Sequence, residues 1–218
     1  MDHRQAKDAL FDGFADVAKA LASGRRAELI DILEQGERHV EPLAAEINQS
    51  VANTSFHLRT LAAAGLVATR RDGTRVYYRL ASGRVGELWA ALRDVAIAHH
   101  GRLDRLVDDY VGDREKLDHV GRDDLARRLA AGEVTVIDVR PPAEYEAGHI
   151  DGARSIPFAS LQELLRELPD DLEVVAYCRD PFCLLADDAV QILTEHGRPA
   201  RRLEGGFPQW ERDRLPVG

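Results

Sequence analysis

The period of the hydrophobic pattern changes along the chain, and this change constrains the fold more than any other feature. From Gln5 to Ala64, apolar side chains recur every three to four residues, which predicts amphipathic helices. From Val134 onward, short β-rich apolar runs such as Val134–Val139 and Glu173–Tyr177 alternate with helical segments. Strands that alternate with helices predict a parallel sheet with helices on both faces. We therefore expect two domains, one mainly helical and one α/β.

Charge divides the chain at a similar place. Residues 1–110 carry 15 Lys and Arg against 16 Asp and Glu, whereas residues 111–218 carry 14 against 22. We expect a helical domain in residues 1–110, a linker in 111–120 and the α/β domain in 121–218. No run approaches the ~18 apolar residues of a membrane span, and the N-terminus lacks an export signal pattern. Two cysteines cannot staple a secreted scaffold, so we expect a cytoplasmic protein without a membrane partner.

A pair of helices followed by a hairpin is predicted inside the first domain. Ser50 can cap a helix over Val51–Ala64, and a shorter helix precedes it, which is the helix-turn-helix arrangement. The runs Leu66–Arg71 and Arg75–Leu80 flank Asp72-Gly73, a strong hairpin signal. A hairpin directly after a helix-turn-helix is a wing.

Basic and small polar side chains of this segment suit DNA. Between Val51 and Gly86 there are six arginines and one acid, Asp72. Arginines on a wing suit phosphate contacts, and small polar side chains on the preceding helix suit base edges in the major groove. The alternative is a solvated hairpin with scattered charges. The candidate DNA-binding residues are Asn53, Thr54, Ser55, His57, Arg59, Arg70, Arg71 and Arg75.

The same residues carry a family resemblance. The run Asn53-Thr-Ser-Phe-His57-Leu-Arg-Thr-Leu61-Ala-Ala-Ala-Gly65-Leu-Val67, followed by Arg70-Arg71-Asp72-Gly73 and Val76-Tyr77-Tyr78-Arg79-Leu80, resembles the ArsR-type winged-helix repressors over roughly residues 10–105. The resemblance implies a homodimer bound to palindromic double-stranded promoter DNA. It also implies dimerisation through the first helix and through the long apolar stripe of residues 84–110, which could instead lie on its own core.

Many ArsR-type repressors sense metals, but this chain departs from their ligand pattern. The family's cysteine pair would fall around residues 38–43, where this chain has no cysteine. On the stripe helix, Asp94, His99 and His100 do not reproduce the usual Asp-x-His arrangement, and adjacent histidines point to different sides of a helix. We therefore expect no metal site in the first domain.

The chemistry is expected in the second domain, at Cys178. Cys178 directly follows the apolar run Glu173–Tyr177 and precedes Arg179-Asp-Pro-Phe-Cys183 and a helix. Ligands of open α/β sheets bind beyond the carboxyl ends of the strands. A loop at a helix N-terminus turns N–H groups toward an anion and lowers the pKa of a thiol. The alternative is a buried structural cysteine.

The surrounding motifs resemble a second family. Val136-Ile-Asp138-Val-Arg140, Gly148-His149-Ile150, Tyr177-Cys178 and Leu203-Glu-Gly205-Gly206 are similar to the motifs of rhodanese (sulfurtransferase) domains, over about residues 115–218. The resemblance implies a rhodanese-like domain with a central parallel sheet, in which Cys178 carries sulfane sulfur as a persulfide. It also implies that Asp138 and Arg140 mainly hold the fold together.

One departure from the rhodanese pattern decides the interpretation. Active rhodanese loops commonly have an arginine where this chain has Cys183, so a bidentate anion clamp is lost. Arg179 stays in the loop, but Asp180 adds a negative charge. Efficient thiosulfate sulfurtransferase activity is therefore not expected, and a weak activity stays open. The candidate catalytic residues are Cys178, Cys183 and Arg179.

A second thiol in the loop suggests sensing. Cys183 could attack a persulfide on Cys178 and close a disulfide, or it could simply be a small residue at a helix start. Our hypothesis is a transcriptional repressor whose rhodanese-like domain senses or carries reactive sulfur from a persulfide, polysulfide or thiosulfate donor, without a cofactor. The alternatives are an active sulfurtransferase tethered to a DNA-binding domain, and a repressor that responds to a thiophilic metal or arsenite through the two thiols.

Overall fold

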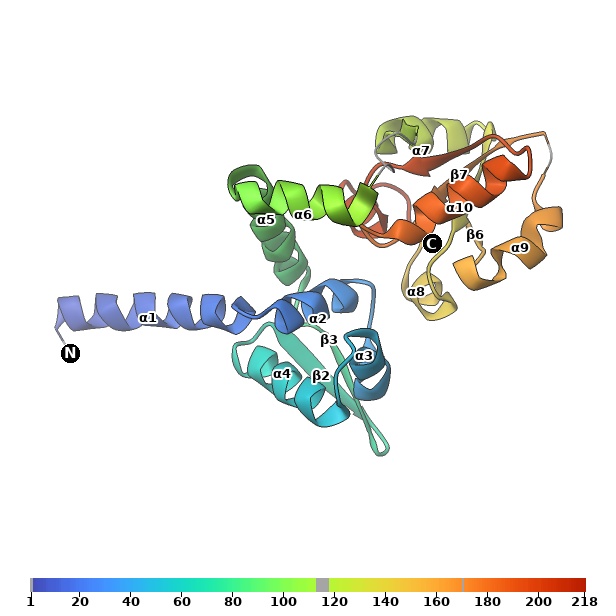
Figure 1. Ribbon diagram of the computed structural model, residues 1–218. Helices are drawn as coiled ribbons and strands as arrows, with labels where there is room; N and C mark the ends of the chain where they lie inside the picture. The colour runs from blue at the N-terminus through green and yellow to red at the C-terminus, as the bar shows by residue number, and fades with distance from the viewer. Residues whose placement is uncertain (1, 113–117, 170) are drawn as a thin grey trace. The chain divides into compact units, whose positions relative to one another are not determined.

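The chain forms two compact units, Met1–His99 and His100–Gly218, which are described separately (Figure 1). The computed structural model describes residues 2–112, 118–169 and 171–218. No helix in these described residues is long and apolar enough to cross a membrane.

The N-terminal unit is a winged helix-turn-helix. Strand β3 lies between β1 and β2 in an antiparallel sheet, and Asp72 pairs with Arg75 across the turn of the wing. Gly73 in this turn has a φ of 58°, a left-handed conformation that glycine adopts at little cost. The elements in chain order are α1 (His3–Leu21), α2 (Gly24–Glu34), β1 (Arg38–His39), α3 (Val40–Glu46), α4 (Val51–Ala63), β2 (Val67–Asp72), β3 (Arg75–Leu80) and α5 (Gly83–His99).

Local signals explain where the helices begin and end. The backbone N–H of Asn53 donates to Oγ of Ser50 at 3.2 Å, which confirms Ser50 as the cap of α4. Gly65 follows α4 with a φ of 73° and turns the chain toward β2. At the start of α1, Asp2 and Gln5 satisfy each other's backbone N–H groups in a capping box.

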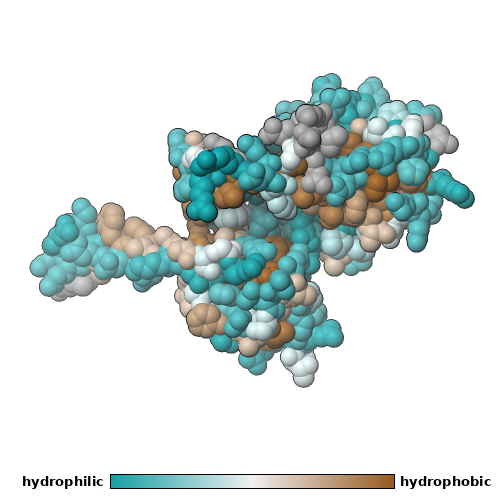
Figure 2. All heavy atoms as spheres, viewed as in Figure 1, coloured by the Kyte–Doolittle hydropathy of each residue, from teal (hydrophilic) through white to brown (hydrophobic). Residues whose placement is uncertain are grey.

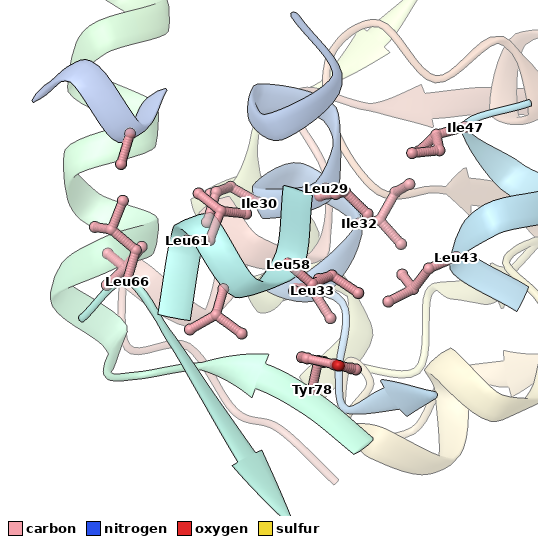
Figure 3. Packing of buried hydrophobic residues seen from close by; sticks show 13 residues of the cluster. Leu29, Ile30, Ile32, Leu33, Leu43, Ile47, Leu58, Leu61, Leu66 and Tyr78 are labelled. Carbon is pink, nitrogen blue, oxygen red and sulfur yellow. The ribbon is translucent and has the colours of Figure 1, made fainter. Parts of the chain in front are cut away.

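The core of this unit is built by α2, α4 and the wing. Figure 3 shows Leu29 and Ile30 from α2 close to Leu58 and Leu61 from α4, and all four are completely buried. Tyr78 of β3 belongs to the same cluster. Each such side chain contributes about 1.5–3 kcal/mol by leaving water. This packing fixes α4 against the wing, so both present their outer faces from one rigid body.

The C-terminal unit is an α/β domain with a five-stranded parallel sheet in the order β4-β8-β7-β5-β6. The predicted fold class, a winged helix-turn-helix followed by a rhodanese-like domain with a central parallel sheet, is confirmed. The elements are α6 (Gly101–Val111), β4 (His119–Val120), α7 (Arg122–Ala130), β5 (Val134–Asp138), α8 (Pro142–Ala147), β6 (Arg154–Ser155), the 3-10 turn η2 (Phe158–Ser160), α9 (Leu161–Leu164), the 3-10 turn η3 (Leu165–Glu167), β7 (Glu173–Tyr177), α10 (Leu184–Glu195), β8 (Ala200–Leu203) and α11 (Phe207–Arg212).

Alternation along β7 explains why helices cover both faces of the sheet. Val174 and Ala176 belong to the hydrophobic cluster that includes the buried side of α10, and Figure 1 shows α10 lying across β7. Val175 and Tyr177 point to the opposite face, where they join a cluster with Trp210 of α11. Successive strand side chains alternate between faces, so a strand that is apolar at every position is buried on both.

The structure differs from the prediction between the two units. The apolar stripe of residues 84–110 does not lie on one continuous helix, because α5 ends at His99 and α6 begins at Gly101. His100 between them has a ψ of 84°, which lies outside the helical range. Of the predicted linker 111–120, residues 113–117 lie outside the described residues, and His119–Val120 form β4. The predicted domain limits stay predictions.

Candidate functional site

Cys178 lies at the carboxyl end of β7, near the middle of the sheet. The residue is 1% exposed and belongs to the apolar cluster on the α10 side. Its backbone carbonyl accepts a hydrogen bond of 3.0 Å from the N–H of Phe207. Strand, cluster and hydrogen bond together hold the thiol-bearing residue in place.

Cys183 is joined to Cys178 by a disulfide bond, with the two Cα atoms 6.1 Å apart. Cys183 is the N-cap residue of α10 and is half-buried. The loop folds back because Asp180 bonds it internally. Its carboxylate accepts from the N–H of Phe182 at 2.6 Å, and its carbonyl accepts from the N–H of Cys183 at 3.2 Å. The structure thus brings the two predicted thiols together.

Arg202 of β8 donates hydrogen bonds to the backbone of the loop. Its Nη2 donates to the carbonyls of Asp180 and Pro181, at 3.0 and 2.7 Å. Its Nη1 donates to both carboxylate oxygens of Asp187 on α10, at 2.9 and 2.8 Å. Arg202 is 4% exposed and Asp187 1% exposed, so this is a buried ion pair that ties the sheet, the loop and α10 together.

Gly206 supports the loop on another side. A Cβ atom at Gly206 would lie 2.4 Å from the carbonyl carbon of Arg179 and 2.5 Å from the N atom of Asp180. Since no real Cβ atom tolerates such distances, the loop can take this path only over a glycine. The Gly205-Gly206 motif therefore has a steric role in the site.

Arg179 is the remaining arginine of the loop, and its guanidinium forms a fork with the carboxylate of Glu144. Its Nε lies 3.1 and 3.0 Å from the two oxygens, and Nη2 makes a further short contact. Glu144 is 1% exposed on α8 and needs this positive charge. An anion that recruited Arg179 would have to compete with a buried carboxylate.

A buried polar network lies under the site. Asp138 and Arg140, both 0% exposed, form an ion pair, and Arg140 also donates to the carbonyl of Gly148 at 2.8 Å. The hydroxyl of Tyr177 donates to Asp138 at 2.6 Å. Burial and the neighbouring Asp138 carboxylate raise the pKa of Tyr177, which keeps this hydroxyl protonated as a donor. All of these side chains are satisfied within the network, as expected for a structural role.

An open pocket of 340 Å³ lies beside the loop. His119, Glu204 and Gly205 line it together with Pro181 and Arg202. The sequence did not lead us to assign Arg202, Asp187 or Glu144 to the site, nor to expect the pocket. A sequence signal for Arg202 was its position in a short segment between apolar residues, in the run Ala200–Leu203, where a charged side chain needs a buried partner.

On the predicted DNA-binding helix, α4, the structure corrects one candidate. Thr54 is 0% exposed, and its hydroxyl donates to the carbonyl of Ser50 at 3.0 Å, so it packs in the core and cannot contact a base. Asn53 and Arg59 are exposed, and Ser55 and His57 are half-buried.

An exposed aromatic residue on this helix was not among the predicted candidates. Phe56 is 58% exposed, which is unusual for a large aromatic side chain. The helical spacing of Phe56 and Arg59 puts both on the outer face of α4. Apolar side chains of this kind contact thymine methyl groups in the major groove.

The wing arginines fall into two groups. Arg71 and Arg75 are exposed. The guanidinium of Arg70 contacts the carboxylate of Glu37, with Nη2 at 2.6 Å, and lies over the ring of Tyr77. The charge of Arg70 is therefore partly neutralised within the protein.

Helix α1 carries an exposed apolar face. Leu10, Phe11 and Phe14 are 56%, 59% and 60% exposed. Figure 1 shows α1 projecting from the body of its unit, and Figure 2 shows hydrophobic colouring along it. On α5, Leu88 and Leu92 are also exposed. Such a concentration of large apolar side chains is typical of an interaction surface.

A winged helix-turn-helix unit that is followed in the chain by a rhodanese-like sheet, with a cysteine loop at the end of its middle strand, defines a class: DNA-binding regulators that carry a rhodanese-like domain. Residues 23–69 match the family described as bacterial regulatory protein, arsR family, and residues 121–213 match the rhodanese-like domain. The HTH-type transcriptional regulator Rv0324 of Mycobacterium tuberculosis is 46% identical over 211 residues, which cover 97% of this chain and 92% of that protein. This chain therefore belongs to the ArsR family of transcriptional regulators and carries a C-terminal rhodanese-like domain, as the motifs predicted.

Two further relatives match one unit each. A sulfurtransferase of Allochromatium vinosum is 32% identical over 46% of this chain and 94% of its own length. The solution structure of a homodimeric winged helix-turn-helix DNA-binding domain from Mycobacterium bovis is 44% identical, covers 45% of this chain and 90% of that one, and has a TM-score of 0.42.

Proposed function

We propose that this regulator is a homodimeric repressor whose rhodanese-like domain senses reactive sulfur through Cys178 and Cys183. The observation that carries the proposal is the bond between these two cysteines across a five-residue sequence separation, at the strand end where rhodaneses carry sulfur. A structural disulfide would be unexpected in a reducing compartment, whereas a short-range reactive pair is typical of redox sensors.

The sensing chemistry needs only the two thiols and a sulfane-sulfur donor. The Cys178 thiolate attacks the sulfane sulfur of a persulfide, polysulfide or thiosulfate, the S–S bond of the donor breaks, and a thiolate, a shorter polysulfide or sulfite leaves with the electron pair. The Cys183 thiolate then attacks the Sγ atom of Cys178. The bond from Cys178 to the outer sulfur breaks, hydrosulfide leaves with the electron pair, and the disulfide closes. The arrival of reactive sulfur is thereby converted into a covalent bond between the two cysteines of the loop.

Sensing fits the loop better than sulfurtransferase turnover. Cys183 occupies the position of the usual arginine clamp, and the remaining Arg179 is engaged by the buried Glu144. An active sulfurtransferase would need another group to hold the thiosulfate anion. A metal or arsenite sensor is also less well supported, because no group of three or more potential ligands occurs among the described side chains.

DNA contact is assigned to the outer face of α4 and to the wing. We place Asn53, Ser55, His57 and Arg59 at base edges or the adjacent backbone. The exposed wing arginines, Arg71 and Arg75, then contact phosphates, with Arg70 in a lesser role because of its partner Glu37. A second copy of the chain is proposed to cover the exposed apolar side chains of α1 and α5.

The test is a DNA-binding titration of the full-length protein under three conditions. Double-stranded DNA is first selected from a random pool by the reduced protein, then labelled for fluorescence anisotropy. Affinity is measured for the reduced, oxidised and polysulfide-treated protein, with sulfur loading followed by mass spectrometry. We expect a change of about tenfold or more on polysulfide treatment, the usual size of an allosteric coupling.

Variants separate sensing from the alternatives. Cys178→Ser is expected to keep the affinity of the reduced protein and to lose the response. The Cys178→Ser/Cys183→Ser protein controls for other sites of oxidation. If wild-type affinity stays constant while mass spectrometry shows complete sulfur loading, the sensing function is wrong. Turnover of thiosulfate with cyanide as acceptor, lost in Cys178→Ala, would instead establish a sulfurtransferase.

A further inference from the structure

We propose that the closed disulfide is itself a receptor for hydrosulfide, and that the incoming sulfur bonds to Cys183, leaving a persulfide on Cys183 and a thiol on Cys178. This inference rests on the proposed sensing function and reverses the roles that the rhodanese resemblance gives to the two cysteines. It makes Cys183 a sulfur-modification site and names the small anion that modifies it.

Access to the two sulfur atoms is unequal. Cys178 is 1% exposed, with the apolar cluster on the α10 side around it. Cys183 is half-buried at the N-terminus of α10 and is one of the partly buried residues packed against that cluster. A nucleophile from solution can therefore reach Cys183 while the loop is closed, whereas it can reach Cys178 only after the loop opens.

The strength of the loop contacts decides which path is faster. Opening the loop breaks the two bonds from Arg202 to the carbonyls of Asp180 and Pro181, and the bond from Phe207 to Cys178. At about fivefold per hydrogen bond, the closed loop is favoured by about a hundredfold.

Leaving-group chemistry opposes this preference. A thiol at a helix N-terminus has a lower pKa than a buried one, so Cys183 is the better leaving group and attack at Cys178 gains from it. Because exchange rates follow thiol pKa with a Brønsted slope of only about 0.5, this gain is on the order of tenfold. Access therefore outweighs leaving-group chemistry, and attack occurs at Cys183.

The charges around Cys183 admit a small anion. The first N–H groups of α10, a helix of 12 residues, carry the positive end of its dipole, and the Cys183 side chain does not cap them. Asp187 in the first turn is neutralised by Arg202, and the Asp180 carboxylate accepts the N–H of Phe182. Phe182 and Leu184, which flank Cys183 in sequence, are half-buried.

The reaction is balanced without an external oxidant. Hydrosulfide donates an electron pair to the Sγ atom of Cys183, and the bond between the two cysteine sulfurs breaks with its pair on Cys178. The hydrosulfide sulfur is oxidised as it enters the persulfide, and the Cys178 sulfur is reduced to a thiolate. The hydrosulfide proton passes to that thiolate, because burial disfavours its charge.

Trypsin offers a direct readout of the attacked sulfur. It cleaves between Arg179 and Asp180, so Cys178 lies on peptide 167–179 and Cys183 on peptide 180–201. The oxidised full-length protein is mixed with sodium sulfide carrying a heavy sulfur isotope. Samples taken at early times are quenched in acid with N-ethylmaleimide and digested. We expect the heavy sulfur on peptide 180–201 and a singly alkylated thiol on peptide 167–179, in a ratio of about tenfold over the reverse pattern.

Two controls separate the effect of burial in the folded protein from the intrinsic reactivity of the two cysteines. In urea the preference for Cys183 is expected to disappear, because access becomes equal. In the reduced single variants, the Cys183 thiol of Cys178→Ser is expected to react with Ellman's reagent at least about tenfold faster than the Cys178 thiol of Cys183→Ser. The folded fraction of each variant is checked by circular dichroism, and equal rates in two folded variants would contradict the access argument.

The outcomes distinguish this inference from the proposed function. Heavy sulfur first on peptide 167–179, or a disulfide that resists sulfide, overturns the inference, and the DNA titration still decides the sensing function. If the heavy sulfur is found on Cys183 but the DNA titration with polysulfide shows no change in affinity, the attack site is supported and the sensing function is overturned.

Discussion

Replacing Arg202 by methionine is expected to destabilise the C-terminal unit and to loosen the cysteine loop. The substitution keeps the apolar stem but removes all four hydrogen bonds to Asp187, Asp180 and Pro181. It also leaves the Asp187 carboxylate, 1% exposed, without its counter-charge. Breaking a buried ion pair by removing one partner costs about 3–5 kcal/mol. At a urea slope of about 2 kcal/mol per M, the midpoint should fall by roughly 2 M.

The assay needs a signal from one unit alone. The chain has two tryptophans, Trp89 in the N-terminal unit and Trp210, 1% exposed, in the core of the C-terminal unit. In a Trp89→Phe background, fluorescence therefore follows unfolding around Trp210. A second readout is the disulfide equilibrium in glutathione buffers. It should shift toward the dithiol in Arg202→Met, because Arg202 holds the loop carbonyls.

Two further variants make the reasoning refutable. Arg201→Met removes the neighbouring arginine, which is 33% exposed and pairs with the half-buried Glu173, so a loss of about 1 kcal/mol and no redox shift are expected. In Arg202→Met/Asp187→Leu the orphaned carboxylate is gone, and most of the stability should return. If Arg202→Met lost no more stability than Arg201→Met, or left the disulfide equilibrium unchanged, the role given to Arg202 would be wrong.

Three other outcomes are expected. Arg75→Ala should weaken DNA binding at all sequences and reduce the slope of log affinity against log salt by about 1, whereas Arg70→Ala should have a smaller effect because an acid already neutralises it. Phe14→Asp should convert the proposed dimer into monomers in analytical ultracentrifugation, since it puts a charge on the exposed face of α1. The hydrogen bond from Arg201 lowers the pKa of Glu173, so this carboxylate stabilises the fold above its unfolded pKa of about 4.3. The stability difference between wild type and Glu173→Gln should therefore shrink as the pH of urea titrations falls through 4.

Local patterns predicted the elements well because their causes are local. The turn at Asp72-Gly73, the cap at Ser50 and the apolar run Glu173–Tyr177 each depend on a few neighbouring residues. Both resemblances rest on such patterns. The short strands β4 and β6 were not predicted, because two residues carry no period and their pairing depends on distant partners.

The side chains that shape the site were harder to predict because their partners lie far away in sequence. Arg202 meets Asp187 across 15 residues, and Arg179 meets Glu144 across 35. Thr54 shows the same limit on α4. Its polarity suggested a base contact, but helical phase places it in the core, where its own backbone satisfies the hydroxyl.

The movement that the cysteine loop can pass on to the rest of the unit depends on which of its residues are held in place. Gly206 packs on its first residues, and Arg202 holds the carbonyls of Asp180 and Pro181. Making or breaking the bond at Cys183 therefore acts mainly on the end of the loop and on the first turn of α10. An effector shifts a conformational equilibrium only through a difference in free energy between two states. Because Arg202 bonds both the loop and Asp187 on α10, a movement of Cys183 that carried α10 with it would strain that buried pair. Breaking such a pair costs about 3–5 kcal/mol, which would be enough for an allosteric coupling of about 1–3 kcal/mol to DNA affinity under the proposed sensing function.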